Sequence, residues 1–453
     1  MNLAVVIMAA GLGTRMKSKL PKVLHPLLGR PMLAYLLEAV KPLHPRQTVV
    51  IVGHQADRVQ AEFAGQASFV VQSPQLGTGH AVQQTRPLLE NTAEAILVLP
   101  GDLPLLSTQT LQKLLDLYQA DSAPLAMLTV ERDNPLGFGR IIRNPQGMVT
   151  AIVEEADCTP EQKAIRELNV GVYVFQAAWL WPNLEKIPLS PKGEYYLTNL
   201  VGMAVAQGRP VQAAPVDNPV ETLGVNNRVH LANIEAILRQ QINQKWMEAG
   251  VTLIDPTTTY IEPEVVIGQD TVIYPDTHLC GRTTIGHDCV IGPHSFIEDS
   301  QVGNGCLIRY SVVEQAIVED NVDIGPFAHL RKGAHLAEGV HMGNFGEVKN
   351  SYLGPGTKMG HFSYLGDTTT GREVNIGAGT ITCNYDGVKK NRTYIGDYAF
   401  IGSDTMLVAP VKVGKNAKTG AGSVVTRDIP DDSLAYGVPA RVQTKNDPQT
   451  NKT

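Results

Sequence analysis

The sequence predicts two folds in one chain, an α/β fold in the first half and a left-handed parallel β-helix in the second. Continuous apolar runs alternate with amphipathic stretches in the first half, whereas the second half repeats an apolar residue followed by glycine with a period of six. Between them, residues 228–249 carry apolar side chains at helical spacing and precede Gly250, which predicts a linker helix. We therefore expect three parts: 1–227, the linker 228–249, and 250–453.

Five short apolar runs in the first half predict strands that are buried on both faces. These runs are continuous, without the alternation of apolar and polar residues that a sheet with one wet face shows. The stretches between them have a helical period, at 31–40, 77–90 and 107–119. Strand–helix alternation predicts a mostly parallel sheet with right-handed crossovers. The expected strands are 3–8, 48–53, 95–99, 125–130 and 170–175.

The second half is a hexapeptide repeat between 261 and 426. Each hexad begins with an apolar head, and small or turn residues lie close to it. Three short flat strands would make one triangular coil with a head pointing inward at every corner, so about nine or ten coils fit this length. The phase breaks at 382–394, where an inserted loop must project. Heads include Ile267, Ile285, Ile291, Ile324, Leu330, Met342, Met359, Leu365, Ile376 and Ile401.

The composition excludes several classes of protein. The chain has 453 residues and a formal net charge of −6, which argues against a nucleic-acid-binding protein. Its five cysteines include no C-x-x-C pair, so we expect neither a disulfide framework nor a zinc site, and a reducing cytoplasm fits best. No apolar stretch reaches the roughly 18 residues of a membrane span, so no membrane partner is expected.

The turn after the first expected strand is a candidate phosphate site. Residues 9–16 read Ala-Ala-Gly-Leu-Gly-Thr-Arg-Met. Backbone N–H groups of a glycine-rich turn at a helix entrance can hold phosphate, and Arg15 and Lys22 would neutralise charge as a phosphoanhydride breaks. The turn is not a Walker A motif, because no Gly-Lys-Ser/Thr follows. From the residues alone, a structural turn with a solvated Arg15 and Lys22 remains an alternative.

Several later motifs add to this turn. Leu-Pro-Lys occupies 20–22, and Pro-Gly-Asp at 100–102 ends an expected strand, where α/β sheets place ligands. The other matching segments are Gln72 with 75–81, 137–140, 153–154, 169–171 and 224–228. Together they resemble the sugar-nucleotide pyrophosphorylases. With the hexapeptide repeats, the resemblance covers almost the whole chain. It is to the family of bifunctional N-acetylglucosamine-1-phosphate uridyltransferases/glucosamine-1-phosphate acetyltransferases, the GlmU type.

The resemblance implies a Rossmann-like nucleotidyltransferase domain that uses UTP and Mg²⁺. Asp102 and Asn226 would hold the metal, which prefers oxygen ligands, although a strand-end cap is the alternative for Asp102. Arg15 and Lys22 would act on the phosphates as catalytic groups. The oxygen of the sugar phosphate would attack the α-phosphorus of UTP and release pyrophosphate without a protein nucleophile.

The same resemblance assigns residues to the uracil base and the sugar. Gln72, Gly77 and Thr78 would contact uracil, whereas His80 is expected to cap a helix rather than act as a base. Gly139, Glu154 and Asn169 would hold the sugar hydroxyls and the N-acetyl group. The full set of candidates for nucleotide and sugar binding is Met8, Ala9, Ala10, Gly11, Lys22, Gln72, Gly77, Thr78, Pro100, Gly101, Asp102, Gly139, Glu154, Asn169 and Asn226.

His361 is the candidate catalytic base of the second half. It interrupts the small-residue pattern in Met-Gly-His-Phe-Ser-Tyr at 359–364, and neutral imidazole suits removal of a proton from an amine near pH 7. On spacing alone, a polar residue on the coil surface remains an alternative. The resemblance makes His361 the base in acetyl transfer from acetyl-CoA to glucosamine 1-phosphate.

Other polar residues of the repeats match family positions. Arg331 and Lys349 are 18 residues apart, one coil, so the repeat predicts that they stack on one face, and Glu347 would orient the site or face solvent. The resemblance implies that the acetyl-CoA site lies between subunits of a homotrimer. The candidates for the sugar phosphate are Arg331, Lys349, Tyr364 and Asn375, and those for acetyl-CoA are Ala378, Asn384, Tyr385, Ser403, Ala421 and, displaced by a gap from the family's late arginine, Arg441.

Three functions are consistent with these motifs. The leading one is synthesis of UDP-N-acetylglucosamine for envelope polysaccharides, by acetylation in the second half and uridylylation in the first. In the second, the β-helix only assembles or regulates a nucleotidyltransferase. In the third, the chain is a scaffold that binds nucleotide. His361, Tyr364 and Asn384 argue against the second function, and the four residues Arg15, Lys22, Asp102 and Asn226 argue against the third.

Overall fold

The computed structural model describes residues 1–120, 123–135 and 137–443. They form two compact units, Met1–Ala236 and a second that begins at Ile237. The division falls inside helix α9 (Arg228–Glu248), at the stretch where the sequence predicts a linker helix. The end of the expected third part, 444–453, lies outside the described residues. No described helix has the length and apolar character that crossing a bilayer requires.

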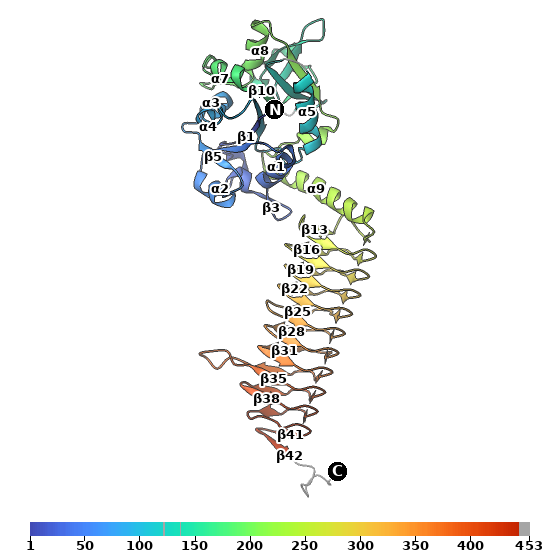
Figure 1. Ribbon diagram of the computed structural model, residues 1–453. Coiled ribbons are helices and arrows are strands. Elements are labelled where there is room, and N and C mark those ends of the chain that lie inside the picture. The colour runs from blue at the N-terminus through green and yellow to red at the C-terminus, as the bar shows by residue number, and fades with distance from the viewer. Residues whose placement is uncertain (121–122, 136, 444–453) are drawn as a thin grey trace. The chain divides into compact units, whose positions relative to one another are not determined.

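The first unit contains a nine-stranded mixed sheet (Figure 1). The strand order is β11-β7-β10-β6-β1-β4-β5, and the hairpin β8–β9 joins it through β10. Strand β10 runs antiparallel to its neighbours β6 and β7, so the sheet is less uniformly parallel than the alternation of elements suggested. The strands are β1 (Leu3–Ala9), β4 (Gln47–Val52), β5 (Ser68–Val71), β6 (Ala95–Pro100), β7 (Leu125–Glu131), β8 (Arg140–Arg143), β9 (Val149–Val153), β10 (Glu167–Gln176) and β11 (Val211–Pro215).

All five expected strands are present, and four further strands lie at the edges of the sheet. Strands β5, β9 and β11 are mostly half-buried, so they lack the continuous apolar run that marks a central strand. The expected helix at 77–90 is two short helices. The helices are α1 (Met32–Val40), α2 (Ala56–Glu62), α3 (Thr78–Gln83), α4 (Arg86–Leu89), α5 (Thr108–Ala120), α6 (Pro160–Lys163), α7 (Ala177–Leu184) and α8 (Asn199–Ala206), and a two-stranded hairpin is formed by β2 (Pro26–Leu27) and β3 (Arg30–Pro31).

Two apolar cores lie on opposite faces of this sheet. Alternate residues of β1 divide between them: Val5 and Ile7 pack with α1, α2 and α5, whereas Ala4 and Val6 pack with α3, α4, α7 and α8. Both faces of the central strands are therefore dry, which is the physical reason for their continuous apolar sequences. The polar loops lie at the ends of the strands.

The second unit is a left-handed parallel β-helix whose strands form three sheets, called here the first, second and third faces (Figure 1). The first face consists of β12 (Thr252–Leu253), β15 (Val272–Ile273), β18 (Val290–Ile291), β21 (Leu307–Ile308), β24 (Asp323–Ile324), β27 (His341–Met342), β30 (Lys358–Met359), β33 (Asn375–Ile376), β36 (Phe400–Ile401), β39 (Lys418–Thr419), β41 (Leu434–Gly437) and β42 (Ala440–Gln443). The second consists of β13 (Tyr260–Ile261), β16 (His278–Cys280), β19 (Phe296–Glu298), β22 (Val312–Glu314), β25 (His329–Leu330), β28 (Gly346–Lys349), β31 (Ser363–Gly366), β34 (Ile381–Cys383), β37 (Met406–Val408) and β40 (Val424–Val425). The third consists of β14 (Val266–Ile267), β17 (Thr284–Ile285), β20 (Gln301–Val302), β23 (Ile317–Val318), β26 (His335–Leu336), β29 (Tyr352–Leu353), β32 (Thr368–Thr370), β35 (Thr393–Ile395) and β38 (Val411–Val413).

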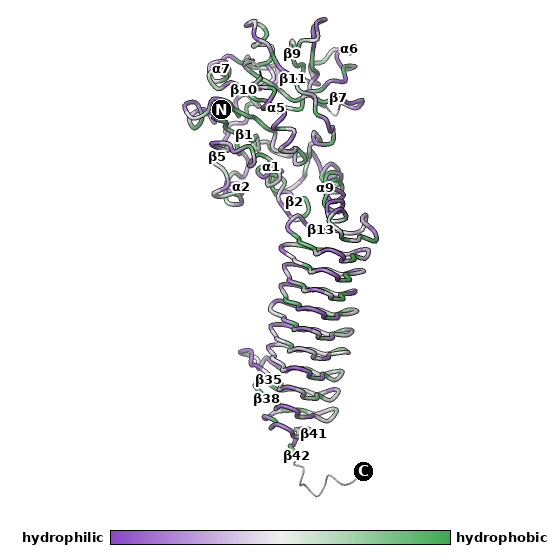
Figure 2. The backbone as a smooth tube through the Cα atoms, turned by 45° about the vertical axis from the view of Figure 1, so that its right-hand side comes forward, coloured by the Kyte–Doolittle hydropathy of each residue, from purple (hydrophilic) through white to green (hydrophobic). Residues whose placement is uncertain are grey.

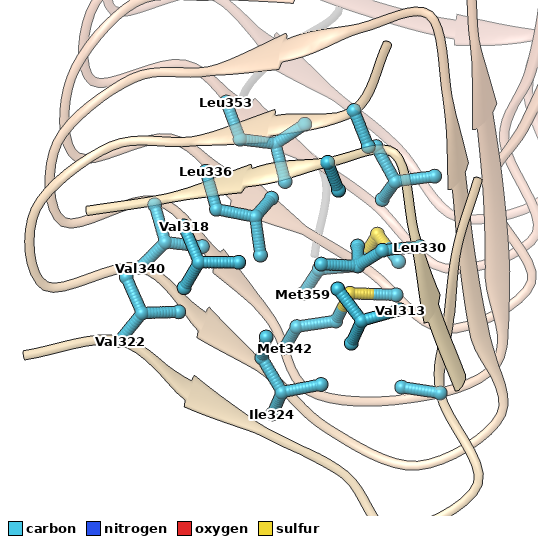
Figure 3. Packing of buried hydrophobic residues seen from close by; sticks show 14 of the residues in the cluster. Val313, Val318, Val322, Ile324, Leu330, Leu336, Val340, Met342, Leu353 and Met359 are labelled. Carbon is cyan, nitrogen blue, oxygen red and sulfur yellow. The ribbon is translucent and has the colours of Figure 1, made fainter. Parts of the chain in front are cut away.

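The apolar heads of the hexads fill the interior of the coils. Leu330, Leu336 and Met342, one from each face, are fully buried and point toward one another in Figure 3. The same alternation of apolar and polar residues recurs from coil to coil in Figure 2. One detail of the prediction is wrong: the heads lie within the strands and not at the corners. Residues such as Tyr310 and Phe345, with φ of 48° and 57°, make the corners instead.

The inserted loop interrupts the stack where the repeat loses its phase. It lies between β34 and β35, and Figure 1 shows it projecting from the coils. Strand pairing resumes beyond it, with Thr368 of β32 beside Thr393 of β35. The loop is therefore added to one coil without breaking the third face.

Candidate functional sites

The glycine-rich turn leaves β1 at the carboxyl end of the parallel strands. Gln75 closes over it by donating from Nε2 to the carbonyl oxygen of Ala10 at 2.7 Å. The end of β6 lies alongside, because the Gly101 N–H donates to the carbonyl oxygen of Met8 at 2.9 Å. Met8 and Ala9 are half-buried, Gly11 is exposed, and Pro100 pairs with Met8 across the two strands.

Four polar side chains from three distant segments converge beside this turn. Lys22 Nζ lies 2.5 Å from Asp102 Oδ2 and 3.3 Å from Asn226 Oδ1. Arg15 Nη2 donates to the same Asn226 oxygen at 2.8 Å. The backbone assists, since the Val225 N–H donates to the carbonyl oxygen of Asp102 at 3.0 Å. The sequence-predicted phosphate and metal residues thus share one small volume.

The oxygens of Asp102 and Asn226 are a fitting pair for Mg²⁺. Both oxygens approach one cation, the Lys22 ammonium, so they converge as the ligands of a cation would. Among the described residues, no three His, Cys, Asp or Glu side chains group as a metal site. In phosphate-transferring sites, Mg²⁺ usually binds one or two protein oxygens and takes its remaining ligands from water and phosphate.

The candidate base-binding residues form a closed network at the start of α3. Gln72 is buried, and its Nε2 donates to the carbonyl oxygen of Gly77 at 3.0 Å and lies 3.1 Å from His80 Nδ1. Thr78 Oγ1 accepts from the Leu197 N–H at 2.9 Å. His80 therefore holds Gln72 in place and does not cap the helix, whose N-cap is Gly77.

The candidate sugar-binding residues lie together beside β10. The Asn169 N–H donates to the carbonyl oxygen of Gly139 at 2.9 Å, and a Cβ on Gly139 would be 3.6 Å from Glu154 Oε2. Glu154 Oε1 accepts from the Thr198 hydroxyl at 2.9 Å. The three residues come from different segments of the chain and converge only in the fold.

Tyr173 fixes the orientation of the Asn169 amide. Asn169 Oδ1 accepts from the Tyr173 hydroxyl at 2.9 Å and from the Gly171 N–H at 3.1 Å. Its oxygen is thereby used inside the protein, so the amide can only donate outward. Burial raises the pKa of the Tyr173 phenol, which keeps this donor protonated. Sequence reasoning missed Tyr173, whose apolar strand gives no sign of a polar role.

On the β-helix, the strand register stacks the candidate phosphate residues. Leu330 pairs with Val348, and the Arg331 N–H donates to the carbonyl oxygen of Val348, so Arg331 and Lys349 occupy neighbouring coils of the second face. Arg331 Nη1 donates to Glu347 Oε1 at 2.8 Å. Glu347 in turn pairs with Tyr364 in the next coil. Glu347 therefore holds Arg331 while its side chain stays 37% exposed, and orientation of the site by Glu347 stays a prediction.

Positive charges on the second face and in the inserted loop repel one another. The pKa of Lys349 is lowered, first by the neighbouring Lys390 and then by Arg331. Arg331 has a raised pKa because of Glu347. A cluster of partly unbalanced positive charge is a site where a phosphate dianion gains from charge neutralisation.

A buried carboxylate that sequence reasoning missed organises the inserted loop. Asp367 accepts from Asn350 Nδ2 and from Asn384 Nδ2, each at 2.5 Å. Asn384 also lies 3.5 Å from the Tyr364 hydroxyl. Gly366 makes room for this network, because a Cβ there would be 2.3 Å from the Tyr364 hydroxyl oxygen and 2.6 Å from Asn384 Nδ2. The sequence gives no signal for this network, because Gly366 follows the head Leu365 as glycines do elsewhere in the repeat.

His361 lies in one column with three of the candidate acetyl-CoA residues. Strands β30, β33, β36 and β39 stack in register on the first face. Two residues beyond their heads, at the corner with the second face, stand His361, Ala378, Ser403 and Ala421, all exposed or half-buried. The small side chains leave this corner open beside His361.

An exposed aromatic column leads up to His361 along the same corner. Phe327 and Phe345 stack with ring centroids 5.3 Å apart, and Tyr310 follows at 5.7 Å from Phe327. Phe327, Phe345 and Phe362 are 55%, 59% and 55% exposed. Stacked aromatic side chains with this exposure are characteristic of a surface that another protein covers.

Three candidates lie apart from these groupings. Asn375 is on β33, one strand from Lys358 on the first face. Tyr385 is exposed in the inserted loop, where its hydroxyl donates to the carbonyl oxygen of Gly387 at 2.7 Å. Arg441 lies on β42 opposite Tyr436, and no hydrogen bond or ion pair joins it to another candidate in the described chain.

Comparison with known proteins matches both units. The family of the MobA-like NTP transferase domain matches residues 5–170, and that of the bacterial transferase hexapeptide (six repeats) matches 264–299 and 392–427. Proteins named "Bifunctional protein GlmU" are similar over nearly the full length. That of Heliobacterium modesticaldum is 47% identical over 95% of this chain and 94% of its own. Those of Exiguobacterium sibiricum and Fervidobacterium nodosum are 47% and 48% identical over 96% of this chain and 97% and 94% of their own.

Proposed function

The chain belongs to the GlmU family of bifunctional proteins, and we propose that it makes UDP-N-acetylglucosamine in two transfers. The β-helix moves an acetyl group from acetyl-CoA to the amine of glucosamine 1-phosphate. The α/β unit then moves a uridylyl group from UTP to the product and releases pyrophosphate. The observation that carries the proposed uridylyl transfer is the convergence of Arg15, Lys22, Asp102 and Asn226.

In the uridylyl transfer, the protein acts by position and charge. An oxygen of the sugar phosphate attacks the α-phosphorus of UTP, the bond to the β-phosphate breaks, and pyrophosphate leaves. Arg15 and Lys22 stabilise the negative charge that develops on the phosphates. Lys22 exchanges its partner Asp102 for phosphate, which frees the carboxylate for a cation. Mg²⁺ held by Asp102 and Asn226 would supply further charge neutralisation.

The two ends of the product are recognised by separate groups. Gln72, Gly77 and Thr78 contact the uracil base. Gln72 is held by Gly77 and His80, and Thr78 accepts from the Leu197 N–H. Asn169 donates from its outward amide to the sugar, and Glu154 accepts from a sugar hydroxyl. Both groups are held by protein contacts before substrate arrives, which lowers the cost of ordering them.

In the acetyl transfer, His361 removes a proton from the substrate amine. The amine nitrogen attacks the thioester carbonyl of acetyl-CoA, and CoA leaves as the thiol after proton transfer. Arg331 and Lys349 bind the sugar phosphate on the second face, and the open corner of Ala378, Ser403 and Ala421 receives acetyl-CoA beside His361. The column that includes His361 is the observation that supports the proposed acetyl transfer.

We propose that the working form is a cytoplasmic homotrimer. The exposed column of Tyr310, Phe327, Phe345 and Phe362 would be covered by a neighbouring copy, which places the seam beside His361. Sedimentation should then give three times the chain mass of 49.0 kDa. Replacing Phe327 and Phe345 by Ser should shift the protein toward monomer and lower CoA release.

The test of the function is one incubation with two readouts. Purified protein receives glucosamine 1-phosphate, acetyl-CoA, UTP and Mg²⁺, and free CoA and pyrophosphate are followed separately. His361→Ala should abolish CoA release and leave pyrophosphate release from N-acetylglucosamine 1-phosphate intact, whereas Lys22→Met should do the reverse. Pyrophosphate release without any CoA release by the unaltered protein would favour an assembly or regulatory role for the β-helix.

A further inference from the structure

Arg140 is a fully buried charge that the proposed chemistry leaves without a role. Its side chain is 1% exposed, at the start of β8. Removing a guanidinium from water is costly, and a buried ion pair is often no more stabilising than apolar residues of the same volume. A cation at this position therefore points to a positional requirement that an apolar side chain could not meet.

The contacts of Arg140 join two loops of the candidate sugar pocket. Its Nη1 donates to the carbonyl oxygen of Phe138, and it forms an ion pair with Glu155 Oε2 at 2.5 Å. Phe138 precedes Gly139, and Glu155 follows Glu154. One guanidinium nitrogen thus ties together the two segments that carry Gly139 and Glu154.

The tied segments cannot move independently without changing the pocket. A Cβ on Gly139 would be 3.0 Å from Ile152 Cγ2, so the two segments are already in close contact. The carbonyl oxygen of Gly139 accepts from Asn169, and the Glu154 carboxylate accepts from Thr198. Release of either segment would displace a group predicted to contact the sugar.

We propose that Arg140, through Glu155, is a positioning residue that sets recognition of the N-acetylated sugar in the uridylyl transfer. This inference rests on the proposed function of the first unit. In the described chain, Arg140 contacts none of the predicted sugar-binding side chains and acts only through the positions of Gly139 and Glu154. Its loss should weaken binding of the sugar phosphate and leave binding of UTP unchanged, because its contacts reach neither the glycine-rich turn nor the segment around Gln72.

The same strand offers a matched control. Arg143 ends β8 and makes a bidentate pair with Glu167, with both nitrogen–oxygen distances 2.6 Å. It is 35% exposed and contacts neither of the two loops. Arg143→Gln removes the same charge and an ion pair from the same strand, so it reports the effect of losing a cation that does not join the two loops.

The experiment measures KM and kcat of pyrophosphate release for Arg140→Gln, Glu155→Gln, the double variant and Arg143→Gln in the full chain. N-Acetylglucosamine 1-phosphate and glucose 1-phosphate are compared as acceptors at saturating UTP. CoA release from glucosamine 1-phosphate is measured on the same preparations, since it reports folding and assembly of the second unit. Circular dichroism and thermal unfolding identify any variant whose first unit is unfolded.

We expect KM for N-acetylglucosamine 1-phosphate to rise about tenfold in Arg140→Gln and in Glu155→Gln, as for one or two misplaced hydrogen bonds. Preference over glucose 1-phosphate should fall, and KM for UTP and CoA release should stay within about twofold. Because both residues act through one ion pair, the double variant should be no worse than the worse single variant.

Three outcomes would overturn the inference. One is an unchanged KM for the sugar phosphate in folded Arg140→Gln and Glu155→Gln. Another is an equal rise in KM for UTP, and the third is an equal effect of Arg143→Gln. If Arg140→Gln fails to fold, Glu155→Gln, whose side chain is 39% exposed, decides the question. Failure of the unaltered protein to release pyrophosphate from UTP and N-acetylglucosamine 1-phosphate would instead refute the proposed function.

Discussion

Replacing Asp367 with asparagine should lower the efficiency of acetyl transfer and leave the rate of uridylyl transfer unchanged. The Asp367 side chain is 7% exposed, and its two oxygens accept from the amide nitrogens of Asn350 and Asn384 at 2.5 Å each. Asparagine has nearly the same shape but offers one oxygen and one NH₂ group. One of the two amide donors would then face another donor.

The expected magnitude follows from the two bonds. A buried hydrogen bond to a charged group contributes about 1.5–3 kcal/mol, so loss of one bond and weakening of the other should cost about 3 kcal/mol. Part of this would appear as a lower free energy of unfolding of the β-helix. The rest would appear as freedom of Asn384, lowering kcat/KM for acetyl-CoA by roughly tenfold to a hundredfold, at about 1.4 kcal/mol per factor of ten.

The assay is CoA release at varied acetyl-CoA, with pyrophosphate release as the internal control. Asp432→Asn is the matched variant, because Asp432 also accepts from an asparagine, Asn416 at 3.1 Å, but on the exposed surface. It should leave both activities unchanged. Wild-type kinetics for acetyl-CoA in Asp367→Asn would refute the reasoning, as would an equal loss in Asp432→Asn.

Three further predictions follow from other contacts. Tyr173→Phe removes one of two donors to Asn169 Oδ1, so it should cost about 1 kcal/mol of stability and raise KM for N-acetylglucosamine 1-phosphate several-fold at constant KM for UTP; calorimetry and steady-state kinetics check this, and an unchanged KM would contradict it. Lys390→Met removes the main cause of the lowered pKa of Lys349, so that pKa should rise in an NMR titration of the Lys349 side chain. The lowered pKa means that charged Lys349 disfavours the folded state, so Lys390→Met should stabilise the protein at neutral pH. This gain in stability should disappear as the pH rises through the lowered pKa toward 10.5. A gain that persists above pH 10.5 would count against the explanation. Removal of Mg²⁺ with EDTA should stop pyrophosphate release and spare CoA release, and the loss should be reversed by added Mg²⁺.

The sequence was sufficient for features that repeat or that are local. The hexad heads predicted the β-helix because each coil packs only on its neighbours, so one rule of burial applies at every turn. The continuous apolar runs predicted the central strands, since both faces of those strands are dry. The glycine-rich turn stood out for the same reason, as its glycines and cations lie within a few residues of one another, and its binding of phosphate stays a prediction.

The tertiary structure decided which distant side chains meet. Arg15 and Asn226 are 211 positions apart, and they meet because the segment before α9 lies along the end of β6, where the Val225 N–H donates to the carbonyl oxygen of Asp102. Tyr173 looked like an ordinary strand residue, Arg140 was the last residue of the 137–140 motif with no role of its own, and Asp367 looked like part of a turn. Their roles depend on which donors and acceptors surround them, and this is set by the packing of separate segments. Periodic burial is a property of neighbours in sequence, whereas the pairing of a buried polar group is a property of neighbours in space.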